Sequence, residues 1–363
     1  MPAVEYKTDD VLTAARKRVA LIFDRFERVV VSVSGGKDST VIRHLCLAEA
    51  ERRRRKVDLF FLDQEAEYAS TVDIMREWMA DPRVRPLWYQ VPLLLTNATS
   101  HRDYWLRAWW PDEEWLRPKE PGAIGDLGGE VGAPQRFYDF FPWLERRAEV
   151  STAYVVGLRS RESFNRYRAV TKRSGCHGWS WSTVTPSPVA FRVYPIYDWT
   201  FGDVWKLIAD EGLHYNAYYD RVYGLRGANA RAMRVSNLIH EKSFRCLTDL
   251  HELEPDTYEA LMRRLGGVHC AALYAKEPGV FDAKSLPADF SSWRAFRDYL
   301  LDTTPIDRID RFRSRFSGQS DDEDTCREQA KQVLINDWEN NLPVSSPRDT
   351  RRRRLRERWW NVL

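Results

Sequence analysis

The sequence predicts an α/β fold with a doubly wound, mostly parallel sheet, followed by a helical C-terminal extension. Three observations support this prediction. A β-branched run at 29–33 leads through a glycine turn directly into a helical pattern. Strand and helix patterns then alternate to about residue 211, which is typical of parallel strands joined by helices. From about residue 245 onward the pattern is helical.

The elements of the sheet domain are expected in a simple order. Periodicity predicts helices over 10–26, 38–54, 69–80 and 137–149, and apolar β-rich runs predict strands over 29–33, 57–63, 86–93, 153–156 and 191–197. Thr200 is suited to begin a further helix, because its hydroxyl accepts from first-turn N–H groups and Asp203 favours the same turn. Gly212 ends that helix. Asp198 and Trp199 are likewise expected to serve in capping and packing.

Length and composition favour a water-soluble protein with a sizeable core. The 363 residues are 43% hydrophobic and 30% charged, with a formal net charge of +3, which is ordinary for a globular protein. We expect a sheet domain over 1–240 with a tryptophan-rich insertion at 97–135 that caps or borders the site. A helical extension over 241–345, with helices at 255–265, 290–301 and 323–340, and a basic tail over 346–363 complete the chain.

The apolar stretches and the spacing of the cysteines indicate the cellular compartment and the cofactors to expect. No apolar stretch approaches the roughly 18 residues of a membrane span, and the N-terminus lacks a signal-peptide core, so we expect a cytoplasmic protein with no membrane partner. Structural zinc sites and iron–sulfur clusters normally use Cys-x-x-Cys pairs, so we expect no iron–sulfur cluster here. The five cysteines, none in such a pair, are Cys46, Cys176, Cys246, Cys270 and Cys326.

The strongest functional signal is the turn between the first strand and the following helix, Ser34-Gly35-Gly36-Lys37-Asp38-Ser39. Its glycines let the backbone turn sharply near a ligand, and unpaired N–H groups in the first helical turn attract an anion. The spacing differs from Walker A, which has four residues between its first glycine and Gly-Lys-Ser/Thr. The residues expected to contact phosphate oxygens are Ser34, Gly35, Gly36, Lys37, Asp38, Ser39 and Thr40.

Two further strand ends contribute polar residues. Asp63 ends the second strand, and we place it near the glycine turn because ligands bind beyond the carboxyl ends of strands in such sheets. The segment 157–163 follows the strand at 153–156. Arg159 is suited to bind a phosphate or sulfate and Glu162 to hold an arginine, while a purely structural Arg159–Glu162 ion pair is the alternative. Positive charge nearby indicates a second anion site formed by Arg161, Arg166, Arg168 and Lys172.

The glycine turn resembles the PP-loop of N-type ATP pyrophosphatases and phosphoadenosine phosphosulfate (PAPS) reductases. Residues 157–163 resemble the Gly-x-Arg-x-x-Glu-Ser pattern of the same superfamily, residues 194–205 its YPI-x-DWT-xx-DVW stretch, and residues 214–220 its YN-xx-YD segment. This resemblance implies an adenine nucleotide alpha hydrolase-like fold that binds an adenine nucleotide, ATP or PAPS. It adds to the phosphate-binding turn the nucleotide-binding residues Asp63, Gly157, Arg159, Glu162 and Ser163.

The chain departs from PAPS reductases in the segment that carries their sulfur chemistry. It lacks their C-terminal Glu-Cys-Gly-x-His segment, whose cysteine attacks the sulfate sulfur, and residues 266–270 are a poor substitute. Residues 233–236, 253–259 and 265–267 resemble instead PAPS-reductase-like proteins described as co-activators of prophage gene expression. That resemblance implies a ParB/sulfiredoxin-like partner protein.

The sequence therefore favours an enzyme that cleaves ATP between its α- and β-phosphates and adenylates a second substrate, either nucleic acid or a sulfur-transfer acceptor. The expected catalytic residues are Lys37, Asp38 and Arg159, with Mg²⁺ held by Asp38 or Asp63. Two alternatives stay open. One is a non-catalytic, nucleotide-sensing regulator that acts with a ParB-like partner. The other is a PAPS-utilising sulfonucleotide enzyme whose nucleophile is Cys176, Cys246 or Cys270.

Overall fold

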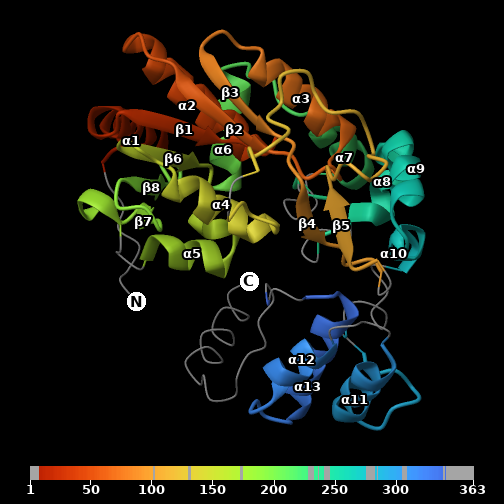
Figure 1. Cartoon of the computed structure of the whole chain (residues 1–363). Coiled ribbons are helices and arrows are strands. Elements are labelled where there is room, and N and C mark those ends of the chain that lie inside the picture. The colour runs from red at the N-terminus through yellow and green to blue at the C-terminus, as the bar shows by residue number, and fades with distance from the viewer. Residues whose placement is uncertain are drawn as a thin grey trace. The chain divides into compact units, whose positions relative to one another are not determined.

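The computed structural model divides the chain into two compact units, Met1–Leu93 with Ala108–Ser236 and Leu94–Arg107 with Asn237–Leu363. It describes residues 8–100, 103–129, 132–171, 175–227, 233–235, 237–240, 246–274, 283, 285–304, 309–337 and 340. The predicted basic tail at 346–363 lies outside these residues, and the predicted domain division at residue 240 stays a prediction. Figure 1 shows the elements of both units in chain order.

A six-stranded sheet forms the centre of the first unit, in the order β3-β2-β1-β6-β8-β7 (Figure 1). Its strands are β1 (Arg28–Ser32), β2 (Val57–Leu62), β3 (Val84–Tyr89), β6 (Thr152–Val156), β7 (Ser182–Val184) and β8 (Ala190–Val193). All neighbouring pairs are parallel except β7 with β8. The predicted α/β class with a mostly parallel sheet is confirmed.

Helices pack on both faces of this sheet. The helices of the first unit are α1 (Val11–Arg25), α2 (Lys37–Arg52), α3 (Ala69–Met79), α4 (Phe137–Arg146), α5 (Phe164–Thr171), α6 (Phe201–Asp210) and α7 (Tyr218–Arg226). Alternate strand residues such as Val31 and Leu59 are fully buried in one core with side chains of α1, α2, α3 and α6. On the opposite face, Phe60 stacks against Phe140 of α4 at a ring-centroid distance of 6.1 Å.

Several element boundaries differ from the sequence prediction for local reasons. The strand predicted over 86–93 is β3, which ends at Tyr89, and Leu93–Thr96 forms a separate strand, β4. Pro92 lies in the break and has no N–H to donate to a continuing ladder. The strand predicted over 191–197 likewise ends before Pro195. The short polar edge strand β7 and the tyrosine-rich helix α7 were not predicted, because neither has a clear apolar period.

The second unit is helical apart from β4 and β5 (Trp105–Ala108), which form a two-stranded sheet. Its helices are α8 (Leu247–Leu253), α9 (Pro255–Arg264), α10 (Val268–Tyr274), α11 (Trp293–Thr303), α12 (Ile309–Phe316) and α13 (Glu323–Leu334). A core of Phe296, Phe312 and Val333 joins the last three helices. The predicted helices at 255–265, 290–301 and 323–340 correspond to α9, α11 and α13. None of the described helices is both long and apolar enough to span a lipid bilayer.

Candidate functional site

The turn between β1 and α2 has the geometry of an anion cradle. Gly35 has a φ of +70°, and a Cβ added there would lie 2.9 Å from Cγ2 of Thr71, so this position requires glycine. Gly36 caps α2 without a side-chain hydrogen bond. Among the described residues, none accepts a hydrogen bond from the backbone N–H groups of Asp38 and Ser39. These N–H groups are therefore available to an anion at the start of α2.

The hydroxyl groups of the turn are tied to one another. The backbone N–H of Ser34 donates to Oγ of Ser39 at 3.0 Å, and the two serine Oγ atoms lie 3.2 Å apart. The hydroxyl of Thr40 donates to the carbonyl oxygen of Gly36 at 3.3 Å. Ser34 is exposed, whereas Ser39 and Thr40 are buried. Ser34 therefore offers the most accessible hydroxyl of the three to a ligand.

Lys37 is buried at the start of α2, with 4% of its surface exposed. Its Nζ donates to the carbonyl oxygen of Met233 at 3.3 Å and lies 3.2 Å from Oδ2 of Asp38. The rings of Phe201 and Tyr219 each lie 5.7 Å from Nζ, and the backbone N–H of Lys37 donates to the Tyr219 hydroxyl. Burial lowers the pKa of Lys37 below its ordinary value. The ammonium group thus lies among a carbonyl oxygen, a carboxylate and two aromatic rings at the start of α2.

The segment after β6 meets the same helical turn. A Cβ added at Gly157 would lie 3.0 Å from the carbonyl oxygen of Asp38, so glycine permits this close approach. Arg159 is buried, its Nε donates to Oδ1 of Asp38, and its second guanidinium nitrogen lies 3.8 Å from Oε2 of Glu162. The structure therefore brings four predicted site residues, Asp38, Gly157, Arg159 and Glu162, together beside Lys37.

Glu162 is a shared partner of several arginines. Besides Arg159, its Oε2 accepts from Arg166, and its Oε1 accepts from Arg234 at 2.6 Å. Ser163 is exposed, and its hydroxyl accepts from the backbone N–H of Arg166. Of the other residues predicted for a second anion site, Arg161 and Arg168 are exposed, and Lys172 lies outside the described residues.

Asp63 lies at the carboxyl end of β2, where its carboxylate is fully engaged. Trp88 Nε1 and Gln90 Nε2 each donate to it at 2.9 Å, Arg117 donates at 2.6 Å, and the backbone N–H of Glu65 donates at 3.0 Å. Asp63 is 1% exposed. These contacts assign it a role in holding this edge of the sheet together, and its predicted contact with the nucleotide stays a prediction.

The predicted magnesium ligands do not form a metal-binding group. Within the part of the chain that the structure describes, no three His, Cys, Asp or Glu side chains are arranged to hold a metal ion. Asp38 is paired with Arg159 and Lys37, and Asp63 with Arg117. Neither carboxylate is free to coordinate Mg²⁺, so the residues do not fit a protein-held ion, and Mg²⁺ stays a prediction.

Part of the tryptophan-rich insertion packs against the loop that follows β2. Trp109 is fully buried, its Nε1 donates to the carbonyl oxygen of Asp63 at 2.8 Å, and its backbone N–H donates to Glu65 at 3.0 Å. The backbone N–H of Leu116 donates to the other Glu65 oxygen. The tryptophan thus serves in packing, and residues 109–117 border the carboxyl end of β2.

Glu67 is a buried carboxyl group in the same loop. It is 7% exposed, and Nε2 of Gln64 is a distant hydrogen-bond donor at 3.4 Å. Burial, with the nearby charge of Asp63, raises the pKa of Glu67 to about 8. Glu67 therefore keeps its proton at neutral pH, because the nearby charge of Arg117 offsets burial and the charge of Asp63 only in part.

Glu67→Gln is expected to change how stability depends on pH. The folded-state pKa lies above the ordinary value of 4.5, so the wild-type protein loses stability as pH rises through this interval. Between pH 5 and pH 8, the wild type should lose about 3 kcal/mol of unfolding free energy relative to the Glu67→Gln variant. Urea unfolding at several pH values measures this, with Glu51→Gln, at a largely exposed side chain, as control. Parallel pH profiles for wild type and Glu67→Gln would contradict the assignment.

The cysteines differ in their readiness to form a thiolate. Burial raises the pKa of Cys46 to about 12 and also raises the pKa values of Cys176 and Cys326. Cys246 and Cys270 belong to the second unit. Cys176, the predicted nucleophile in the first unit, is therefore protonated at neutral pH and poorly suited to attack sulfur.

The motif around residue 199 has the predicted structural role. Asp198 accepts two hydrogen bonds from Arg18 of α1, and Trp199 Nε1 donates to the backbone of α1 at Val11. Thr200 and Asp203 form a reciprocal capping box at the start of α6. The capping and packing prediction for this segment is confirmed.

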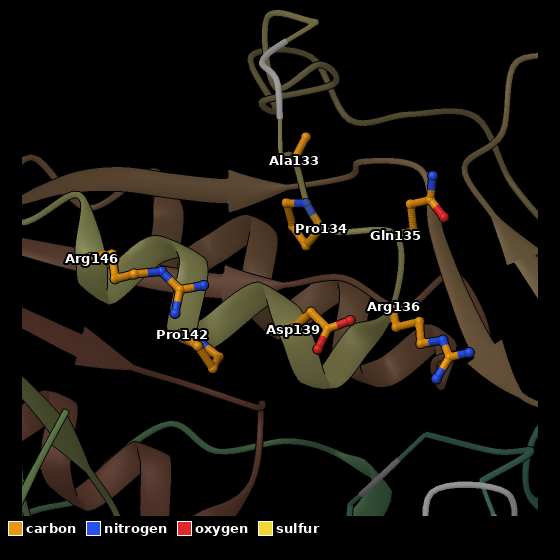
Figure 2. A pocket seen from close by; sticks show the side chains of 8 residues that line it. Ala133, Pro134, Gln135, Arg136, Asp139, Pro142 and Arg146 are labelled. Atoms are coloured by element: carbon orange, nitrogen blue, oxygen red, sulfur yellow. The ribbon is translucent and has the colours of Figure 1, made fainter. Parts of the chain in front are cut away.

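A pocket of about 470 Å³ lies beside α4 (Figure 2). Its walls come from α4 and from the segment that precedes it. None of the predicted site residues contributes to them. The lining residues are Gly132, Ala133, Pro134, Gln135, Arg136, Asp139, Pro142 and Arg146.

Sequence reasoning missed four residues of this region, two near the glycine turn and two near the loop that follows β2. Tyr219 and Arg234 lie in segments that the motif comparison identified, but no role was assigned to them. Glu67 and Arg117 carried no signal, because their burial depends on how the insertion packs against β2. All four acquire their surroundings from chain segments remote in sequence.

Comparison with known proteins gives two family matches. Residues 139–273 match the phosphoadenosine phosphosulfate reductase domain, and residues 227–322 match a domain of unknown function, DUF3440. The first match includes Arg159 and Glu162 but begins after the glycine turn. The chain is also 28% identical over 322 residues to the uncharacterized protein YbdN of Escherichia coli (strain K12), covering 85% of this chain and 79% of that protein.

Three solved structures show weak similarity. The PAPS reductase of Candida auris is 13% identical, with 60% of this chain and 93% of that chain covered and a TM-score of 0.34. The FMN adenylyltransferase of Candida glabrata is 12% identical, with 65% and 66% covered and a TM-score of 0.38. The U34-tRNA thiolase NcsA of Methanococcus maripaludis is 12% identical, with 78% and 88% covered and a TM-score of 0.31. Similarity this low says nothing about the chemistry of this chain.

Proposed function

We propose that this chain, whose residues 139–273 match the phosphoadenosine phosphosulfate reductase domain, binds ATP at residues 34–40 and cleaves it between the α- and β-phosphates. The adenylyl group passes to a second substrate, and pyrophosphate leaves. One bond forms, between an oxygen of the second substrate and the α-phosphorus. One bond breaks, between the α-phosphorus and the oxygen bridging to the β-phosphate.

The start of α2 carries this proposal. The available N–H groups of Asp38 and Ser39 and the ammonium group of Lys37 converge on one turn. Donors fixed in advance stabilise the charge that develops on a departing pyrophosphate without reorganising during the reaction. Lys37 exchanges its contact with the Met233 carbonyl for a phosphate oxygen. Arg159, held by Asp38, adds positive charge at the same place.

The burial of Cys176 disfavours this residue as the nucleophile of the alternative PAPS-reducing function, while Cys246 and Cys270 stay predictions. Sulfur chemistry on PAPS needs a thiolate, and burial raises the pKa of Cys176. The adenylyl-transfer function needs only charge stabilisation and positioning. The nature of the second substrate, nucleic acid or a sulfur-transfer acceptor, and a ParB-like partner stay predictions.

Measurement of the released phosphate species tests the function. The full-length protein is incubated with ATP, with and without RNA or DNA, and pyrophosphate and inorganic phosphate are measured separately. We expect pyrophosphate release with formation of AMP or an adenylated acceptor. Release of inorganic phosphate alone would contradict α–β cleavage. ATP binding without release of either species under every condition would identify a nucleotide-sensing regulator instead.

A further inference from the structure

The cluster around Glu162 carries more positive than negative charge. Ion pairs link its side chains to one another, beginning at the glycine turn. Among the described residues, the cluster has four cations and two anions, so its net charge is +2. The two buried cations, Lys37 and Arg159, both pair with Asp38, so the excess positive charge lies on the two partly exposed arginines. A bound group with two negative charges would neutralise the cluster. Its cations are Lys37, Arg159, Arg166 and Arg234, and its anions are Asp38 and Glu162.

Arg166 and Arg234 retain hydrogen-bonding capacity. Each donates to a different oxygen of the Glu162 carboxylate, which fixes the two guanidinium groups next to each other. A guanidinium carries five N–H donors, and these contacts use only part of them. The side chains of Arg166 and Arg234 are 38% and 50% exposed, so a ligand can reach the remaining donors. Two fixed guanidinium groups suit the oxygens of a phosphate or sulfate.

The segment that carries Arg234 is tied to the glycine turn at two points. The carbonyl oxygen of Met233 accepts from Lys37, and the guanidinium of the next residue, Arg234, donates to Glu162. Met233 is 6% exposed. These contacts fix Arg234 beside the residues that would bind a nucleotide. Arg234 also lies within residues 227–322, so the domain of unknown function contributes a side chain to this site.

We propose that Arg166 and Arg234, positioned by Glu162, bind one tetrahedral oxyanion that is distinct from the phosphates at residues 34–40. The inference rests on the proposed nucleotide site and narrows the class of the second substrate. Because ATP carries no phosphate on its ribose, the second substrate must carry this phosphate or sulfate group.

Calorimetric titration of full-length variants tests the proposal. The variants are Arg166→Ala, Arg234→Ala and, as control, Arg16→Ala, whose half-exposed side chain likewise pairs with one glutamate. The probes are α,β-methylene-ATP, adenosine 3′,5′-bisphosphate, and inorganic phosphate added to protein saturated with α,β-methylene-ATP. Loss of a charged hydrogen-bonding partner should weaken binding about 10- to 100-fold.

The pattern of losses separates the two sources of the anion. Weaker binding of inorganic phosphate alone in Arg166→Ala and Arg234→Ala supports an oxyanion of the second substrate. Weaker binding of the bisphosphate alone would identify a ribose phosphate of the nucleotide and overturn this assignment. Unchanged binding of every probe, or equal losses that include α,β-methylene-ATP, would overturn the proposal. If wild type binds phosphate through Arg234 but binds no nucleotide, the oxyanion site stands and the proposed ATP function fails.

Discussion

Lys37→Met should lower the rate of pyrophosphate release from ATP by about 100- to 1000-fold, the usual effect of removing one fixed donor from a developing charge. The substitution keeps a long apolar side chain between the rings of Phe201 and Tyr219. Asp38 keeps its pairing with Arg159. The fold should therefore survive, and the loss should arise from the missing ammonium group. The steady-state rate of pyrophosphate release measures catalysis, and the melting temperature measures whether the fold is retained.

Lys206→Met provides the matched control. Lys206 lies on α6 with a largely exposed side chain that pairs with Asp210. We expect its rate of pyrophosphate release to stay within about threefold of wild type, because surface ion pairs contribute little. A Lys37→Met variant that melts like the wild type and releases pyrophosphate at a comparable rate would show that Lys37 does not assist the departing group.

Arg117→Met should lower the free energy of unfolding by about 3–5 kcal/mol, because it leaves a buried carboxylate without its cation. Asp63 is almost fully buried, and the guanidinium of Arg117 donates to both of its oxygens. Trp88 and Gln90 would remain as donors but carry no compensating charge. The effect should appear in urea unfolding as a lower midpoint.

A double-mutant cycle shows whether the loss comes from the ion pair. The Asp63→Asn/Arg117→Met protein should be more stable than the sum of the two single losses implies, because no unpaired charge remains. Lys206→Met is the control, since Lys206 also pairs with a carboxylate, that of Asp210, but both side chains are largely exposed. Its loss should stay below about 1 kcal/mol. Additive losses at Asp63 and Arg117 would show that the two residues act independently.

The local elements of the first unit were predictable because their signals are local. The β-branched run of β1, the glycines after it and the capping box of Thr200 with Asp203 each act within a few residues. Segment ends were less predictable where a proline interrupts a ladder, as at Pro92. Helix α7 was missed because its stability comes from burial of Tyr218 and Tyr219 rather than from helix propensity.

In the candidate site, too, the local motifs were predictable and the long-range contacts were not. The glycine turn and the segment at 157–163 were identified as separate motifs, and parallel strand order brings their ends together. The partners of each charged residue were not predictable, because they come from distant segments. Arg159 meets Asp38 and Glu162, whereas Asp63 meets Arg117 of the insertion.

The sequence alone therefore determined the α/β class and the anion-binding turn, since short patterns of glycine, charge and apolar period encode them. Only the tertiary structure decided which charges are balanced. It paired Asp63 directly with Arg117, buried Glu67 beside Asp63, and gathered three arginines on Glu162. The physical reason is that the strength of a charge interaction depends on burial and on distances of a few ångströms, and long-range packing sets both.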